Sequence, residues 1–422
     1  MICILKVFLA ILVGMVLVDS ANAENWPGWR GPRGDGTSNE RNIPTDWDGA
    51  TGRNIAWRVP VPGRGYASPV VWDDRVFLAT CVETTDQRDV LCLDRRTGAT
   101  RWQQTVLTAP LEKKHTLNSF ASSTPVTDGR LVFVTFLEPD FGSRTKVTPG
   151  NLVVASYDME GHQAWLVRPG RFASVHGFCS SPILFENLVI VNGDHDGAAY
   201  IVALDRQTGK TVWKRPRANK TRSYVTPIIR HLAGREQMVL SGSKSIVSLN
   251  PRDGSRYWII DGPTEQFVAS LVDNGKLLFM TAGYPDHHIM AIRPDGHGNV
   301  TDTHVVWHTT RGCAYVPSPI IQGKYFLVSA DNGIASCFEA ATGKRFWMKR
   351  LGKHYSASLV SAQGLVYFLA DDGTTKVVRP GPRLDVVATN ELGENCYASP
   401  ALSRGQIFIR TTKQLVCIGA SR

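Results

Sequence analysis

The sequence predicts an all-β protein: an eight-bladed β-propeller of four-stranded antiparallel blades, the last of which is closed by an N-terminal strand. Three observations support this prediction. A dipeptide recurs eight times, a pattern of four short strands accompanies each complete copy, and the last copy lacks its fourth strand. At 422 residues the chain could hold two or three average domains, but propellers commonly use this length for one closed unit.

The recurring dipeptide is Ser or Thr followed by Pro, with Leu in place of Pro in two copies. Successive copies lie 40 to 57 residues apart, and a period in this range is typical of repeat architectures such as propellers. The copies begin at Ser68, Thr124, Ser181, Thr226, Ser270, Ser318, Ser358 and Ser399.

Each copy is followed by a short apolar strand, an alternating second strand such as residues 75–79, and a third such as residues 90–94. A tight hairpin comes next, as at residues 94–98, where Gly98 supplies a positive φ and Asp94 caps the turn. A fourth strand is then predicted to end on tryptophan, and residues 386–387 replace the tryptophan in the seventh copy. The tryptophans are Trp102, Trp165, Trp213, Trp258, Trp307 and Trp347.

The eighth copy stops after its third strand, residues 414–418, because the chain ends within a few residues. Residues 54–59, which precede the first copy, have the pattern of the missing strand, including Trp57. We therefore expect Trp57 to lie beside the strand that contains Cys417, which removes the exposed edges of an open array. An open solenoid is the alternative, but it would need polar capping repeats instead of one repeat divided between the termini.

An apolar run from Ile2 to Val18, interrupted by Lys6, predicts a signal peptide over residues 1–23 with cleavage after Ala23. An uncleaved membrane anchor is the alternative, because the run is nearly long enough to span a bilayer. No later segment is expected to cross a membrane. We expect a periplasmic or secreted monomer in which residues 24–53 form an irregular strap and residues 54–420 a single propeller domain.

The net charge of +10 favours contact with anionic partners, but the basic residues are scattered, which argues against nucleic acid. Seven cysteines remain after cleavage, and an odd number cannot pair completely. None forms a Cys-x-x-Cys pair. We expect them to be small buried apolar side chains.

The period, the Asp-x-x-Thr-Gly hairpin at residues 94–98 and the tryptophan series resemble the PQQ-like β-propeller repeat family over roughly residues 54–420. This superfamily takes in quinoprotein alcohol dehydrogenases and the outer-membrane assembly protein BamB, so the resemblance implies the fold and leaves two classes of function open. Residues 26–32, Trp-Pro-Gly-Trp-Arg-Gly-Pro, are followed by Gly34-Asp35-Gly36. This leader resembles that of the planctomycete-type branch, whose members mostly lack an established activity.

Candidate binding residues map to one face of the predicted ring. In an antiparallel blade, the loop that enters the first strand and the turn between the second and third strands lie at the same end. An aromatic residue precedes each dipeptide, and these rings either pack between inner strands or line a vestibule at the axis. They are Tyr66, Phe120, Phe178, Tyr224, Phe267, Tyr315, Tyr355 and Tyr397.

Polar residues accompany these rings, and their convergence on a concave mouth would suit an anionic or sugar-like ligand. Solvated loop side chains are the simpler alternative. The predicted ligand-binding residues are Arg64, Tyr66, His115, Asn118, His176, Arg222, Tyr224, Glu265, Arg311, Tyr315, His354, Tyr355 and Asn395.

No metal site is predicted. Residues 192–197 and 286–288 contain metal-ligating types, but residues 331–333 and 371–373 occupy the same turn in other blades, where Asp, Asn and Gly serve the hairpin. PQQ with Ca²⁺ is a conceivable cofactor without a supporting motif, since an adjacent Cys pair and the haem motif Cys-x-x-Cys-His are absent. The nucleophile motif Gly-x-Ser-x-Gly is absent too.

Two functions remain. The first is a non-enzymatic binding or scaffolding propeller of the cell envelope, which would recognise a cell-envelope protein, an extended peptide, or an anionic or carbohydrate ligand. The second is a quinone-dependent oxidoreductase or another enzyme with a small ligand, in which His176, His354 or Glu265 would transfer protons. We favour the first because it needs no catalytic motif. No nucleic-acid partner is expected.

Overall fold

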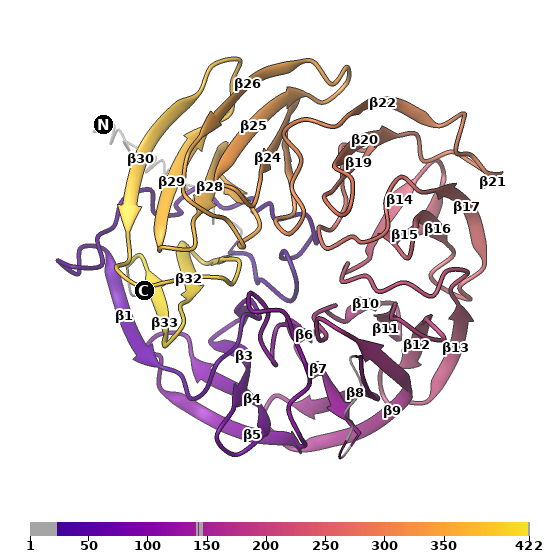
Figure 1. The fold of residues 1–422 in the computed structure, drawn as a ribbon. Helices are drawn as coiled ribbons and strands as arrows, with labels where there is room; N and C mark the ends of the chain where they lie inside the picture. The colour runs from indigo at the N-terminus through magenta and orange to yellow at the C-terminus, as the bar shows by residue number, and fades with distance from the viewer. Residues whose placement is uncertain (1–22, 141, 143–146, 421–422) are drawn as a thin grey trace, which may run out of the picture.

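Eight sheets are arranged in a ring around a central axis, as Figure 1 shows. The computed structural model describes residues 23–140, 142 and 147–420. The predicted fold, an all-β eight-bladed propeller, is confirmed. Except for Ala23, the predicted signal peptide lies outside the described residues. Among the described residues, no helix has the length and apolar character needed to cross a membrane.

Blades 1 to 4 come first along the chain. Blade 1 contains β2 (Val70–Trp72), β3 (Arg75–Val82), β4 (Gln87–Asp94) and β5 (Thr100–Thr108). Blade 2 contains β6 (Val126–Thr127), β7 (Leu131–Pro139), β8 (Thr148–Asp158) and β9 (Gln163–Ser174). Blade 3 contains β10 (Ile183–Phe185), β11 (Leu188–Gly193), β12 (Tyr200–Asp205) and β13 (Thr211–Pro216). Blade 4 contains β14 (Ile228–Leu232), β15 (Arg235–Gly242), β16 (Ser245–Leu249), β17 (Arg256–Asp261) and β21 (Gly298–Asn299).

Blades 5 to 8 complete the ring. Blade 5 contains β18 (Val272–Asp273), β19 (Leu278–Ala282), β20 (His288–Ile292) and β22 (Val305–Thr309). Blade 6 contains β23 (Ile320–Gln322), β24 (Tyr325–Ser329), β25 (Ile334–Glu339) and β26 (Arg345–Arg350). Blade 7 contains β27 (Val360–Ala362), β28 (Leu365–Leu369), β29 (Thr374–Arg379) and β30 (Asp385–Glu391). Blade 8 contains β31 (Ala401–Ser403), β32 (Gln406–Arg410), β33 (Gln414–Ile418) and β1 (Ile55–Pro60).

Blade 4 departs from the prediction because it has a fifth strand. β21 pairs in parallel with β17 and places Gly298 beside Trp258. The segment between β20 and β22 belongs to blade 5 in sequence, but it folds back over the outer edge of blade 4. The repeat pattern does not show this pairing, since it joins two different copies.

Blade 8 is built from both ends of the chain, as predicted. β1 pairs antiparallel with β33, and Trp57 lies opposite Cys417. Figure 1 shows the indigo β1 beside the yellow β33. The Trp57 indole nitrogen donates a hydrogen bond of 3.0 Å to the Arg95 carbonyl of blade 1. The added strand therefore completes blade 8 and also joins it to blade 1.

At six junctions the repeated tryptophan links one blade to the next. Trp57 shows the arrangement: Gly98 of blade 1 has φ +75°, and a Cβ there would come within 2.7 Å of the Trp57 ring. The tryptophan and the hairpin glycine are therefore two parts of one contact. The indole donors and carbonyl acceptors, 2.9–3.1 Å apart, are Trp57 and Arg95, Trp102 and Met159, Trp165 and Arg206, Trp213 and Pro251, Trp307 and Ala340, and Trp347 and Gly381.

The prediction that the fourth strand ends on tryptophan was wrong. Trp102 is the third residue of β5, and Trp213 is the third residue of β13. Each strand continues because its ladder with the third strand resumes after a register shift next to the tryptophan. The polar residues after the tryptophan belong to an outer strand whose free side faces solvent.

The recurring Ser or Thr hydroxyl forms a belt of hydrogen bonds around the axis. At six junctions, the backbone N–H of this residue donates to the hydroxyl of its counterpart in the next blade, at 2.9–3.0 Å. Ser318 N–H, for example, donates to Ser358 Oγ at 2.9 Å. The side chain thus satisfies an inner-strand amide that would otherwise be buried without a partner. This role explains why the position alternates only between Ser and Thr.

Residues 24–53 cross the face opposite the predicted binding loops, where the first and second strands of each blade are joined. Trp26 bridges to Val71 of blade 1, and Thr37 bridges to Ser361 of blade 7. Trp26 and Trp47 are buried in a core cluster shared by blades 1, 7 and 8. We call residues 24–53 the strap. In Figure 1 its indigo trace runs toward the centre of the ring.

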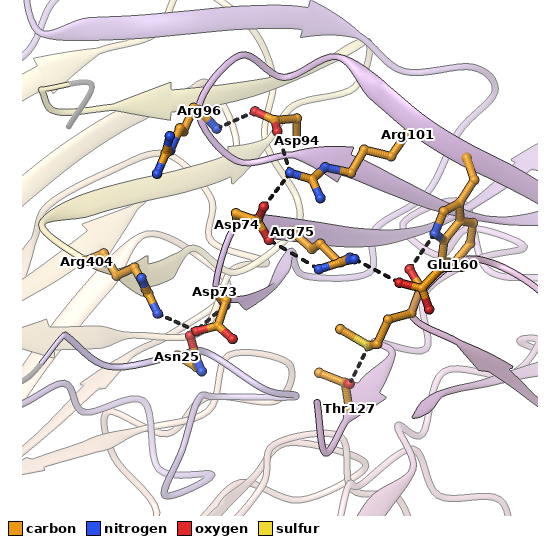
Figure 2. Close-up of polar contacts among 12 residues, drawn as sticks. Asn25, Asp73, Asp74, Arg75, Asp94, Arg96, Arg101, Thr127, Glu160 and Arg404 are labelled. Atoms are coloured by element: carbon orange, nitrogen blue, oxygen red, sulfur yellow. Dashed lines mark hydrogen bonds and ion pairs between the residues drawn. The ribbon is translucent and has the colours of Figure 1, made fainter. Parts of the chain in front are cut away.

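A polar network surrounds the seam between blades 8 and 1, as Figure 2 shows. Arg404 of blade 8 forms an ion pair with Asp73 of blade 1, and the Asp73 N–H donates to Asn25 of the strap at 2.8 Å. Arg75 extends the network to Glu160 of blade 2 at 3.0 Å. These side chains are partly exposed, and exposed ion pairs add little stability. The strand pairing of β1 and the buried strap therefore close the ring.

Removing residues 24–60 should abolish the closure. The deletion takes away β1 and the strap, so the apolar edge of β33 is exposed and favours association with other chains. We expect aggregation and a lower melting temperature, measured by light scattering after size-exclusion chromatography and by calorimetry. A chain that starts at Glu24 is the control. A deletion variant that stays monomeric with an unchanged melting temperature would contradict the closure.

The hydroxyl belt can be tested with two matched serines. Replacing Ser358 by Ala leaves the buried Ser318 N–H without its acceptor and should destabilise the fold by about 1–3 kcal/mol in urea denaturation. Ser68 is equally buried, but its hydroxyl has no hydrogen-bond partner among the described residues, so Ser68→Ala should change stability little. Equal losses in both variants would refute the proposed role of the hydroxyl.

Candidate functional site

A cavity of about 520 Å³ lies on the propeller axis and opens on the loop face. All eight blades and the strap contribute to its wall, and its volume falls within the 300–1,000 Å³ that is usual for small-molecule sites. The side chains most important for its chemistry are Trp29, Tyr66, His115, Asn118, His176, Cys179, Arg222, Tyr224, Gln266, Tyr284, Tyr315, Asp331 and Tyr397.

Trp29 of the strap closes the cavity at the end nearest the strap. Its indole nitrogen donates a hydrogen bond of 3.1 Å to Ser270 Oγ, and Ser270 Oγ donates to the Thr226 carbonyl at 3.0 Å. Other hydroxyls of the belt, such as that of Ser399, also line this end. We call the cavity a blind pocket because, in the described part of the chain, Trp29 covers its end at the belt.

The eight aromatic residues before the dipeptides divide between the two predicted environments. Tyr66, Tyr224, Tyr315 and Tyr397 line the cavity. The other four, Phe120, Phe178, Phe267 and Tyr355, pack into the clusters between blades. A phenol ring can keep its polar tip at a wet surface, whereas phenylalanine has no polar atom to place there.

Seven of the thirteen predicted ligand-binding residues reach the cavity wall. They are Tyr66, His115, Asn118, His176, Arg222, Tyr224 and Tyr315. The structure brings these side chains together from blades 1, 2, 3, 4 and 6.

The other six predicted residues do not line the cavity. Arg64, Arg311 and Asn395 are exposed in the loops. Glu265 pairs with Lys244 at 3.2 Å, and His354 Nδ1 lies 2.6 Å from Asp371 Oδ2. Tyr355 is 1% exposed and packs edge-on against Phe368, so it is part of the core.

Nitrogen-bearing side chains gather on the wall formed by blades 2 to 4. The rings of His115 and His176 meet edge to face with centroids 5.7 Å apart, and Asn118 Nδ2 donates to the His176 carbonyl at 2.8 Å. Arg222 Nη1 forms an ion pair of 2.7 Å with Asp196 Oδ1. Burial lowers the pKa of His176, and the positive charge of Arg222 lowers it further. The His176 imidazole is therefore neutral at neutral pH.

Asp331 and Cys179 were not predicted as wall residues. Asp331 accepts hydrogen bonds from the N–H groups of Tyr315 and Val316 at 2.8 and 3.1 Å, and burial raises its pKa. Burial also raises the pKa of Cys179 to about 12, so its thiol is protonated and a weak nucleophile. The sequence assigned Asp331 to a hairpin turn, and nothing in the local pattern indicates that this turn borders the axis.

Trp29, Gln266 and Tyr284 were missed for different reasons. Trp29 stands in the unusual leader at residues 26–32, which is the one sequence signal that sets it apart. Gln266 and Tyr284 occupy loops of irregular length in blade 5. Their positions follow from the isolated bridge between them, which is a tertiary feature.

The turns with metal-ligating residue types are held by other contacts. Asp194 pairs with Arg217 at 2.9 Å, and the ring of His195 packs against Phe172. His288 Nδ1 lies 2.8 Å from His308 Nε2. Within residues 23–140, 142 and 147–420, no group of three or more His, Cys, Asp or Glu side chains is arranged to hold a metal ion.

The cavity does not fit PQQ with Ca²⁺. PQQ carries three carboxylates, whereas the arginine of the wall, Arg222, is already paired with Asp196. A calcium ion needs six to eight oxygen ligands. Both carboxylate oxygens of Asp331 are engaged by backbone N–H groups, and the described residues show no metal-ligand cluster beside them.

Comparison with known proteins supports a specific repeat family. A family model described as outer membrane protein assembly factor BamB matches residues 86–293. BamB from Moraxella catarrhalis has a similar structure, with a TM-score of 0.61 at 12% identity over 87% of this chain and 97% of that chain. No curated protein matches the chain.

Two dehydrogenases have the same fold. A europium-containing methanol dehydrogenase has a TM-score of 0.64 at 12% identity, over 93% of this chain and 90% of that chain. The quinohemoprotein alcohol dehydrogenase ADHIIG from Pseudomonas putida HK5 has a TM-score of 0.60 at 12% identity, over 94% and 80%. Likenesses at this identity concern the fold alone.

These findings define the protein first as an eight-bladed propeller with a blind axial pocket. The repeated hairpin and tryptophan, together with the match over residues 86–293, show that this chain carries PQQ-like β-propeller repeats.

The protonation of His176 can be checked by NMR. Because folding lowers its pKa below 6.5, the unfolded chain binds the proton more tightly, and protonation of His176 destabilises the fold as the pH falls below that value. We expect its ring protons to titrate below pH 6.5. Arg222→Met should raise this pKa, since it removes a positive charge and leaves Asp196 unpaired. His176→Gln assigns the resonance, and titration at or above 6.5 would contradict the burial effect.

Proposed function

We propose that the protein is an exported, non-enzymatic binding propeller of the cell envelope, and that its ligand enters the axial cavity from the loop face. The blind, tyrosine-lined cavity is the observation that supports this function most strongly. It offers a concave surface with a few polar groups at its wall, which is the usual form of a binding site.

The polar groups of the cavity are better arranged for binding than for proton transfer. Of the three residues considered for proton transfer, only His176 lies at the wall. Its ring has no hydrogen bond to a carboxylate in the described part of the chain, so nothing there orients it as a general base. Asp331 is held by two N–H groups, and the thiol of Cys179 is protonated.

The free cysteines are compatible with an exported protein. All seven in the described residues are unpaired, and six of them are buried. Burial raises the pKa of Cys81 and of Cys92 to about 12, which suppresses the thiolate that oxidants attack. The signal-peptide pattern at residues 1–23 supports export, and the leader at residues 26–32 supports a place in the planctomycete-type branch.

The loop face has apolar side chains suited to a larger partner. Leu117 and Tyr284 line the cavity and are 44% and 52% exposed. They stand on blades 2 and 5, on different sides of the mouth. By analogy with the assembly factor BamB, the partner would be a cell-envelope protein or peptide, or a ligand that such a partner carries.

The enzymatic alternative can be tested with the cofactor itself. Purified protein is mixed with PQQ and Ca²⁺, and melting temperature, quinone absorbance and dye reduction with alcohols and sugars are measured. We expect no thermal shift and no turnover, because Arg222 is already paired and no calcium ligand set is present among the described residues. A PQQ-dependent alcohol dehydrogenase assayed in parallel is the positive control, and PQQ-dependent turnover by the propeller would overturn the proposed function.

A further inference from the structure

Two pairs of tyrosines line separate parts of the cavity wall. Tyr66 of blade 1 and Tyr397 of blade 8 have ring centroids 4.7 Å apart and planes tilted by 42°. Tyr284 and Tyr315, of blades 5 and 6, have centroids 6.4 Å apart with the same tilt. Each pair presents flat apolar rings with polar tips, a surface suited to a ligand that is apolar on its faces and polar at its edge.

The remaining wall supplies polar side chains, among them Arg222 and Gln266. Asp196 Oδ1 accepts hydrogen bonds from Arg222 Nη1 and from the Arg222 backbone N–H. Arg222 Nε and Asp196 Oδ2 stay buried without a partner in the described part of the structure. Neither atom has an accessible surface, so a ligand meets the exposed part of the Arg222 side chain and the amide of Gln266, which both line the cavity and can bind hydroxyl groups.

The wall carries little net charge at neutral pH. Asp196 compensates Arg222, and burial lowers the pKa of His176 so that its ring is neutral. Burial also raises the pKa of Asp331, which opposes a free negative charge there. A polyanion would lack counter-charges at this wall. A wholly apolar ligand would cover the accessible polar groups of Arg222 and Gln266 without replacing their hydrogen bonds to water, which is unfavourable.

We propose that the cavity binds the ring of a neutral sugar. The inference rests on the proposed binding function and specifies its ligand class. The ring lies between the two tyrosine pairs, its hydroxyls bind Arg222 and Gln266, and Trp29 forms the floor beneath it. Ring faces of a pyranose are largely C–H and its rim is hydroxyl, which matches the two kinds of wall.

The test uses three neutral tetrasaccharides: maltotetraose, cellotetraose and chitotetraose. Binding to the full-length mature protein is measured at pH 7 by calorimetry and by the change in tryptophan fluorescence. We expect at least one of them to bind in the millimolar range or tighter. The charged tetragalacturonate should bind at least about tenfold more weakly, which corresponds to 1.4 kcal/mol. A pool of random hexapeptides is the third probe.

Point variants locate the site. Tyr315→Ala, Tyr397→Ala and Arg222→Met should each weaken saccharide binding by about tenfold or more, with the fold checked by circular dichroism and melting temperature. Tyr355→Phe is the matched control. Tyr355 occupies the same repeat position, but it is buried against Phe368 and its hydroxyl has no partner among the described residues. Binding should not change in this variant. Trp29→Phe should diminish the fluorescence signal.

Three results would overturn the proposal. The first is no binding of any neutral tetrasaccharide. The second is tighter binding of tetragalacturonate or of the hexapeptides. The third is saccharide binding that survives both Tyr315→Ala and Arg222→Met, which would place the site outside the cavity. None of these outcomes refutes the proposed non-enzymatic binding function. That function would be refuted by PQQ-dependent turnover.

Discussion

The pairing of β1 with β33 is the interaction on which the rest of the structure depends. Without it, blade 8 has three strands and Trp57 cannot reach the Arg95 carbonyl of blade 1. The edge of β33 would then be exposed, which favours association with other strands. The same N-terminal segment carries Trp26 and Trp47 into the core shared by blades 1, 7 and 8. The same N-terminal segment therefore both closes the ring and completes this core.

The cavity depends on this closure through the hydroxyl belt and the strap. The belt fixes the inner strands at hydrogen-bond distance, and the belt residue Ser270 receives the indole N–H of Trp29. A residue far from the repeats in sequence thus becomes the floor of the pocket that the repeats enclose. Tyr66, Tyr224 and Tyr397 each stand two residues before a belt residue, and Tyr315 stands three before one, so the belt also positions these rings.

The repeat pattern predicted the sheet count, the divided last blade and the end of the ring at which the cavity opens. It also placed His115, His176 and Arg222 near one another, because residues at equivalent positions of a closed repeat converge on the axis. It could not separate Tyr315 from Tyr355. The two occupy the same repeat position, but Tyr355 turns toward Phe368 and into the core. Tyr355 belongs to a core cluster that joins blades 6 and 7, so its placement depends on tertiary contacts.

The sequence by itself determined the architecture, since a hairpin glycine, a tryptophan and a Ser or Thr recur at spacings that make sense only if neighbouring blades contact one another through them. Only the tertiary structure decided which polar groups remain available for a ligand. Asp196 compensates Arg222, backbone N–H groups engage Asp331, and Trp29 blocks the axis. These are contacts between different blades or with the strap, and a local pattern along the chain carries no information about pairings at such sequence distances.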